Sequence, residues 1–172
     1  MKTAALLALS ACALFAQNPT VAEMKTAYTG IKNNLTRMAE KMPADQYEFK
    51  PVAEIRSFGA LMAHVADSQL RTCSLINGEA KTPNAGSKTA KDDIVAALKE
   101  SFVECDKAWD ATTEANASTM MSGGRGQTSR LGLLTRFIVV HGNEEYGYGA
   151  IYLRLKNIVP PSSDNQGGGR KQ

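Results

Sequence analysis

The chain has 172 residues, of which 43% are hydrophobic and 22% charged, enough for one domain with a buried core. Lys and Arg number 20 and Asp and Glu number 17, which gives a net charge of +3. A surplus this small argues against nucleic-acid binding, which needs a concentrated basic face. The counts of 14 Gly, 6 Pro and 3 Cys exclude collagen-like, disordered and disulfide-dense chains.

The first residues predict export. Lys2 is followed by an almost wholly apolar run, Ala4 to Phe15, which at about 12 residues is shorter than the ~20 that a spanning helix needs. This pattern is typical of a secretory signal peptide. We therefore expect residues 1–16 to be removed, and the mature chain to start at Gln17 in the periplasm or outside the cell.

Two alternatives for this segment stay open. Cleavage after Ala13, with Ala11 at the minus-three position, is the first. The second is a lipoprotein anchored through Cys12, because residues 9–12 resemble a lipoprotein box. The apolar run continues through Phe15, whereas a lipoprotein would turn polar there, so we favour the cleaved and soluble form.

Two helices are expected in the first half of the chain. The first runs from about Pro19 to Lys41, and its apolar residues recur at spacings of three and four, as in a helix bundle. A connector follows, in which Pro43 and Pro51 exclude a helix. Ser57 is a good N-cap for the second helix, which is expected to run to about Asn77 with Gly78 just past its end.

Two further helices are expected in the second half. The third runs from about Lys91 to Ala115, and residues 116–129 form a flexible connector without strands. The fourth runs from about Arg130 to Asn157, and residues 160–172 form a disordered tail. Eight residues share one face of the fourth helix: Leu134, Phe137, Ile138, His141, Glu145, Tyr148, Tyr152 and Leu155. The pattern predicts an all-α four-helix bundle over residues 17–159, with long connectors.

Cys73 and Cys105 decide the order of the helices. In an exported protein they form either a disulfide or two buried free thiols. Counted from the starts of their helices, the two cysteines differ in height by only ~3 Å if the second and third helices run parallel. The 13 residues from Gly78 to Ala90 can span roughly 43 Å, enough to return along the second helix. We therefore predict a Cys73–Cys105 disulfide and an up-down-down-up bundle.

The two histidines of the chain, His64 and His141, both lie on apolar helix faces. Each alone is more often a hydrogen-bonded core residue than a ligand. Glu145 follows His141 by four residues, so both side chains project from one face, and bundles recruit metal ligands in this way. Glu144 is an alternative that spacing alone leaves open. Rise per residue places His64 and the His141–Glu145 pair roughly 8 to 14 Å apart in height, so the arithmetic permits a shared site without proving it.

Two groups of motifs carry a resemblance to a known family. Met42-Pro43, residues 47–51, Arg56–Gly59 and Ala63-His64-Val65 form the first group, and this segment resembles the DinB/YfiT-like metalloenzymes. His141–Gly147, residues 152–156 and Val159–Pro161 form the second group, and this ending is similar to the secreted branch of that family. The resemblance implies a four-helix bundle in which three histidines bind a divalent metal, with His64 and His141 as the first two. Where the family has its third histidine, this chain has Glu145, which favours Glu145 over Glu144.

The resemblance also implies a thiol-dependent transferase or isomerase. Our first hypothesis is an exported enzyme of transferase or hydrolase type that uses Zn, Ni, Mn or Fe at His64, His141 and Glu145 to activate water or a thiol for attack on an unknown small molecule. Tyr148 and Tyr152 are candidates for contacts to the substrate or to the ligands. The alternative is a non-catalytic exported bundle with a degenerate metal site, which binds a small molecule or a partner protein. We expect no nucleic-acid partner and no transmembrane segment, and a homodimer stays open.

Overall fold

The computed structural model describes residues 20–123 and 126–168. The expected signal peptide, its cleavage sites and Cys12 lie outside these residues, so export stays a prediction. No helix in the described ranges is both long and apolar enough to cross a membrane.

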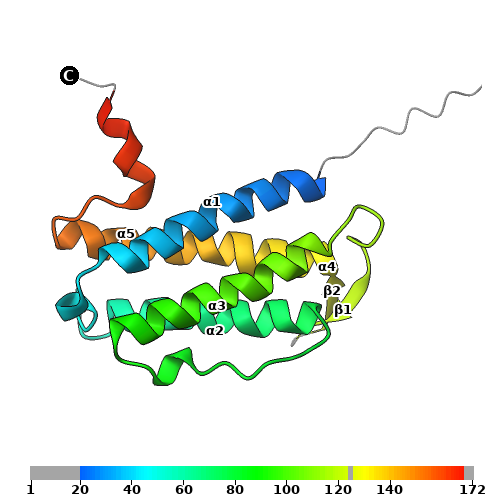
Figure 1. Ribbon diagram of the computed structural model, residues 1–172, viewed down its shortest axis with the longest axis horizontal. Helices are drawn as coiled ribbons and strands as arrows, with labels where there is room; N and C mark the ends of the chain where they lie inside the picture. The colour runs from blue at the N-terminus through cyan, green and yellow to red at the C-terminus, as the bar shows by residue number, and fades with distance from the viewer. Residues whose placement is uncertain (1–19, 124–125, 169–172) are drawn as a thin grey trace, which may run out of the picture.

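Four helical rods form the bundle (Figure 1). The first three are α1 (Thr20–Lys41), α2 (Phe58–Ile76) and α3 (Lys91–Asp110). The fourth consists of α4 (Arg130–Leu134), a π-helical segment (Thr135–Val140) and α5 (His141–Leu155), which follow one another without a break. Single 3-10 turns cover Ala44–Gln46 and Ala85–Ser87. The expected all-α bundle is confirmed.

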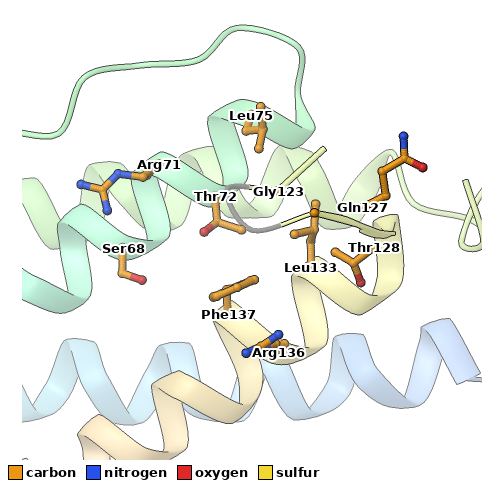
Figure 2. A pocket seen from close by; sticks show the side chains of 11 residues that line it. Ser68, Arg71, Thr72, Leu75, Gly123, Gln127, Thr128, Leu133, Arg136 and Phe137 are labelled. Carbon is orange, nitrogen blue, oxygen red and sulfur yellow. The ribbon is translucent and has the colours of Figure 1, made fainter. Parts of the chain in front are cut away.

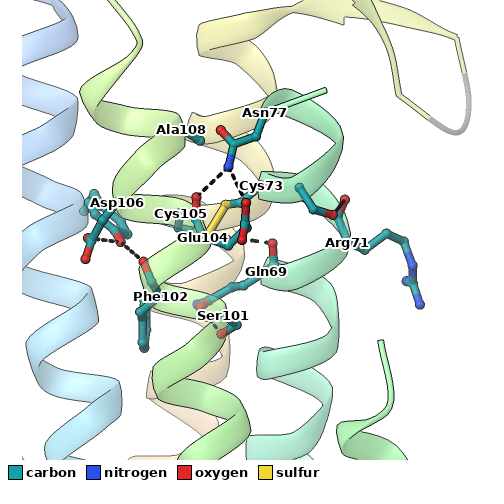
Figure 3. The surroundings of a disulfide bond; sticks show 12 residues. Gln69, Arg71, Cys73, Asn77, Ser101, Phe102, Glu104, Cys105, Asp106 and Ala108 are labelled. Atoms are coloured by element: carbon teal, nitrogen blue, oxygen red, sulfur yellow. Dashed lines mark hydrogen bonds between the residues drawn. A yellow bond between two sulfur atoms is a disulfide. The ribbon is translucent and has the colours of Figure 1, made fainter. Parts of the chain in front are cut away.

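Helices α2 and α3 run parallel and are joined by the predicted disulfide (Figure 3). Cys73 bonds to Cys105, and one turn earlier the Ser101 hydroxyl donates to the side chain of Gln69 at 3.2 Å. Because both pairs are separated by 32 residues, the two helices advance in the same direction. Both cysteines are fully buried, so the bridge lies inside the core.

Helix α1 runs antiparallel to α3. Lys25 near the start of α1 pairs with Asp110 at the end of α3 at 2.6 Å, and Glu40 near the end of α1 pairs with Lys99 at 2.7 Å.

Helix α5 runs parallel to α1. Gly142 faces Ile31, and seven residues later Gly149 faces Met38. A Cβ atom at Gly149 would collide with the Met38 sulfur, so the missing side chain allows the two helices to approach closely. These directions give the predicted up-down-down-up order.

The core is continuous through all four rods. Its large members are almost completely excluded from solvent: Leu35, Met38, Met42, Tyr47, Phe58, Met62, Ile94, Leu98, Phe102, Trp109, Leu133 and Leu134. The regular stripe in α1 supplies Tyr28, Ile31, Leu35 and Met38 to this core, as expected from its spacing.

The ends of α2 are fixed by a cap and a glycine. The Ser57 hydroxyl caps the start of α2 by accepting from the Ala60 amide, and Gly78 ends it with a φ of 84°, a conformation that favours glycine.

The connector between α2 and α3 is held against α2. The Asp67 carboxylate accepts hydrogen bonds from the amides of Ala85 and Gly86 at 2.8 and 2.9 Å. The connector therefore runs back along α2, and α3 begins at the end of the bundle where α2 begins.

Two expectations for the region after α3 are wrong. Helix α3 ends at Asp110 rather than Ala115, because Asn116 folds back to accept from the Thr113 amide and to donate to the Ala111 carbonyl. The expected strandless connector contains a short hairpin, β1 (Met120–Ser122) paired antiparallel with β2 (Gln127–Ser129). Three-residue strands are too short to produce a detectable alternation in the sequence.

The beginning of the expected disordered tail is ordered. Residues Pro161–Gly168 form a 3-10 helix, and the Asp164 carboxylate pairs with Arg37 and Lys41 of α1 at 2.6 Å each. The Tyr146 hydroxyl accepts from the Ser162 amide and also bonds to its hydroxyl. The expectation of disorder rested on the polar, Gly-rich sequence, but these polar contacts attach the segment to the bundle without an apolar pattern. Residues 169–172 lie outside the described residues.

Candidate metal centre

Three side chains from two helices meet at one point. His64 lies near the middle of α2, and His141 and Glu145 lie in the first turns of α5. The two Nε2 atoms are 3.3 Å apart, and Oε1 of Glu145 lies 3.3 Å from His141 Nε2 and 3.7 Å from His64 Nε2. Glu145 is buried and His141 is partly buried, whereas the His64 side chain is 36% exposed. The centre is therefore open to solvent on the side of α2.

The packing and backbone geometry of α5 orient His141 and Glu145 toward α2. Gly142 and Gly149 lie against α1, so the side of α5 that carries His141 and Glu145 points to α2. The π-helical segment ends at Val140, directly before His141. A π turn carries an extra residue and changes the angle between the helix before it and the helix after it. The sequence showed only a continuous helix here, and no residue in the pattern signals the wider turn.

The donor set fits a divalent metal ion. Ligand atoms at the corners of a tetrahedral site with bonds of about 2.0–2.2 Å lie about 3.3–3.6 Å apart, close to the separations seen here. Two Nε2 atoms 3.3 Å apart are joined either by a hydrogen bond, in which one neutral imidazole donates its Nε2 proton to the other, or by a cation that both bind. The three donors are thus close enough to share one metal ion. That a metal ion binds there stays a prediction.

The charges around the centre favour deprotonated donors. Burial and the positive charge of Arg56 lower the pKa of His64 from its ordinary value, against the opposing pull of Glu145. Burial acts to raise the pKa of Glu145, but the hydrogen bond from His141 and the charges of His141, His64 and Arg56 outweigh it, so this pKa is lowered. A neutral His64 and an ionised Glu145 at neutral pH are the forms that bind metals.

Two polar atoms in this centre are buried and have no hydrogen-bond partner within the described ranges: Nδ1 of His141 and Oε2 of Glu145. Imidazoles that bind metals usually donate their second nitrogen to an acceptor, so His141 departs from that arrangement. Since Oε2 of Glu145 has no partner within the described residues, it can accept a hydrogen bond from a water or small molecule bound at the centre.

A cavity of about 660 Å³ opens beside the centre, between the start of α2 and the second half of α5. Glu145 forms part of its wall, together with Arg56, Leu61, Tyr148, Ile151 and Tyr152. The size is that of a small-molecule site. The Tyr152 hydroxyl donates to the Arg56 carbonyl at 2.7 Å and holds the two ends of the helices together.

The structure brings together some of the expected residues and separates others. Glu144 is exposed and accepts a hydrogen bond from the Tyr148 hydroxyl at 3.1 Å, so it is not the third member of the cluster. Tyr148 and Leu155 share the face of His141 as expected, but they are 49% and 54% exposed. Tyr148 is exposed because it lines the open cavity. Leu155 is exposed because it is the last residue of α5, at the end of the bundle. Sequence reasoning missed Arg56, whose charge acts on both His64 and Glu145.

Comparison with solved structures finds proteins of similar fold. The solved structure of a DinB-like protein from Bacillus cereus is similar, with a TM-score of 0.68 at 12% identity over 81% of this chain and 95% of that one. The mycothiol-dependent maleylpyruvate isomerase has a TM-score of 0.59, and a variant of it 0.60, both at 18% identity over 77% of this chain. This chain spans 60% of the length of that isomerase.

These likenesses concern the fold. No curated protein matches the chain. A family model described as the DinB superfamily matches residues 27–148, which include His64, His141 and Glu145. This range covers well over half of the sequence, and so the chain belongs to the DinB superfamily.

Proposed function

We propose that the protein is a divalent-metal-dependent enzyme of the transferase or hydrolase type that acts on a small molecule. The observation that carries the proposal is the convergence of His64, His141 and Glu145 from helices 77 residues apart in sequence. Two imidazoles and one carboxylate form a ligand set of catalytic zinc sites, which keep a position open for water or substrate. When bound, such an ion lowers the pKa of a water or thiol and makes it a nucleophile at neutral pH.

The protein's own residues supply the other functions of the site. Oε2 of Glu145 is buried and has no hydrogen-bond partner within the described residues, so it would accept the proton that a bound water loses. The cavity wall formed by Leu61 and Ile151 holds an apolar part of the substrate, and the Arg56 side chain supplies a positive charge beside it. The half-exposed Tyr148 hydroxyl can leave Glu144 and donate to a substrate oxygen.

The proposal includes export to the periplasm or the extracellular space. A buried disulfide such as Cys73–Cys105 persists in oxidising compartments and is rare in the cytoplasm. Low-molecular-weight thiols are cytoplasmic cofactors, so we favour water as the nucleophile. The solved relative described as mycothiol-dependent keeps a thiol as the second choice.

The test is metal binding by the purified protein. We expect one equivalent of metal after dialysis against Zn, Ni, Mn or Fe, measured by elemental mass spectrometry. If structural zinc gains about 10–16 kcal/mol from four ligands, one ligand contributes about 3 kcal/mol, so His64→Ala and His141→Ala should each weaken binding about 100-fold. Glu145→His should tighten binding, because it restores the third imidazole that the family motif has.

Glu144→Gln is the matched control, since it removes a neighbouring carboxylate outside the cluster, and it should bind metal like the parent. Affinity should fall with acidification, because protonated imidazoles do not bind metals; the lowered pKa of His64 keeps that one imidazole neutral to lower pH than an ordinary histidine. A parent protein that takes up none of the four metals contradicts the proposal. The alternative, a bundle that only binds small molecules or partners, would then take its place.

A further inference from the structure

A second cavity lies on the other side of the metal centre, in the same groove between α2 and the fourth rod. Its volume is about 450 Å³. Figure 2 shows its walls: Ser68, Arg71, Thr72 and Leu75 on α2, Leu133 on α4, Arg136 and Phe137 on the π-helical segment, and Gln127 and Thr128 on β2. Ser68 follows His64 by one helical turn, and Phe137 precedes His141 by about one turn. The second cavity therefore lies about one helical turn from His64 and His141.

The charges of this second cavity have one sign. Arg71 and Arg136 line it, and among the described residues no Asp or Glu does. Within residues 20–123 and 126–168, neither guanidinium has an ion-pair partner, whereas Lys25, Lys32, Arg37 and Lys99 on α1 and α3 are all paired. Arg136 lies over the ring of Phe137, with its carbon 5.2 Å from the ring centroid. Two unpaired guanidinium groups beside a concave surface favour carboxylate or phosphate groups, which they bind with charge-assisted hydrogen bonds.

The rest of the lining suits a ligand that is not a bare anion. Phe137, Leu75 and Leu133 provide apolar surface, and Phe137 is only partly buried, so its ring can contact a ligand. The hydroxyls of Ser68, Thr72 and Thr128 offer donors and acceptors between the apolar surface and the arginines. The larger cavity differs, since it is lined by Glu54 and Glu145 as well as by Arg56.

We propose that this second cavity is a binding site for small organic anions that combine a carboxylate or phosphate with an aromatic or apolar group. Arg71 and Arg136 bind the anionic group, and the partly exposed Phe137 and Leu75 pack on the apolar part. Binding here does not depend on a metal ion. A further consequence rests on the proposed function: Arg71 lies seven residues from His64, about 10 Å along α2, so a ligand of that length reaches the metal centre.

The test uses the whole protein without metal, and methyl NMR spectra with three probes. Phenylacetate and phenyl phosphate should cause saturable shifts of the Leu75 and Leu133 methyl signals, and inorganic phosphate should bind at least tenfold more weakly. The Leu61 methyl signal, from the larger cavity, should stay unchanged. Comparison of phenylacetate with phenyl phosphate decides which anion the site prefers.

Variants separate charge recognition from simple apolar binding. Arg71→Gln and Arg136→Gln should each weaken phenyl phosphate about tenfold, in line with the loss of a charge-assisted contact. Arg154→Gln on α5 removes the same charge from a distant exposed position and should leave binding unchanged. His64→Ala should also leave it unchanged, so a failure of metal binding and a failure of this proposal are distinguished.

Three results would overturn the proposal: no saturable shift with either aromatic anion in the millimolar range, equal affinity for the neutral benzyl alcohol, or equal weakening by all three arginine variants. The last outcome would mean that only net charge matters.

Discussion

Removal of the disulfide should show how much of the stability depends on α2 and α3 being joined. The bridge closes a loop with a sequence separation of 32 residues. In the chain-entropy model, a loop of about 33 residues costs the unfolded state about 12.5 cal/mol/K, or about 3.7 kcal/mol at 25 °C. We expect Cys73→Ala to lower the free energy of unfolding by about this amount, and the unfolding temperature by about 7–15 °C.

The assay is urea unfolding followed by circular dichroism. Cys105→Ala and the double variant should be destabilised about as much as Cys73→Ala, because each change already removes the whole bridge. The slope of free energy against urea should rise in all three, since the unfolded chain becomes more extended. Ser101→Ala, which removes another buried side chain one turn away in α3, is the control and should cost only about 1 kcal/mol. Additive effects of the two cysteine changes, or a loss below about 1 kcal/mol, would refute the reasoning.

Two further predictions concern packing and charge. Gly149→Ala should destabilise the protein by about 1–2 kcal/mol, because the new Cβ collides with the fully buried Met38. Gly147→Ala, which has open space around it, should instead stabilise the protein by about 0.5–1 kcal/mol. Thermal unfolding of both variants checks these opposite signs. The hydrogen bonds from Lys81 and Asn77 lower the pKa of Glu104. A lowered carboxyl pKa stabilises the fold above its ordinary value and is lost on acidification, so Glu104→Gln should be less stable than the parent at pH 7 and similar near pH 3; a difference independent of pH would contradict this.

The fold could be predicted because its signals are local or covalent. The three-four spacing in α1, the Ser57 cap and Gly78 each depend on a few neighbouring residues, and they fixed the helices to within a few positions. The order of the helices needed one long-range constraint, which Cys73 and Cys105 supplied.

The position of the candidate centre could be predicted only in part. The height estimate assumed that the ends of α2 and the fourth rod are level. In the structure Tyr152 bonds to the Arg56 carbonyl, so the end of α5 extends beyond the start of α2. Counted from that contact, His64 is about 12 Å along α2, and Glu145 and His141 are about 10 and 16 Å along α5. The apparent gap was an error in the reference point, and sequence periodicity contains no information about such an offset.

The two faces of α2 explain how a stable bundle can hold an open polar groove. Cys73 follows His64 by nine residues, which is about 900° of rotation, so the two side chains point in opposite directions. The face with Cys73 and Gln69 is fixed to α3 by the disulfide and by the Ser101 hydrogen bond, and it is completely buried.

The opposite face carries His64, Ser68 and Arg71, and it contributes to the metal centre and the second cavity. It contributes few contacts to the core, because it borders cavities. Helix α2 is therefore held in place by α3 and by the Asp67 contacts to the connector, and near its start also by Phe58, whose ring lies beside that of Tyr152 on α5. Substitutions in the groove can then change ligand binding without loss of the fold, whereas substitutions at the face toward α3 change stability first.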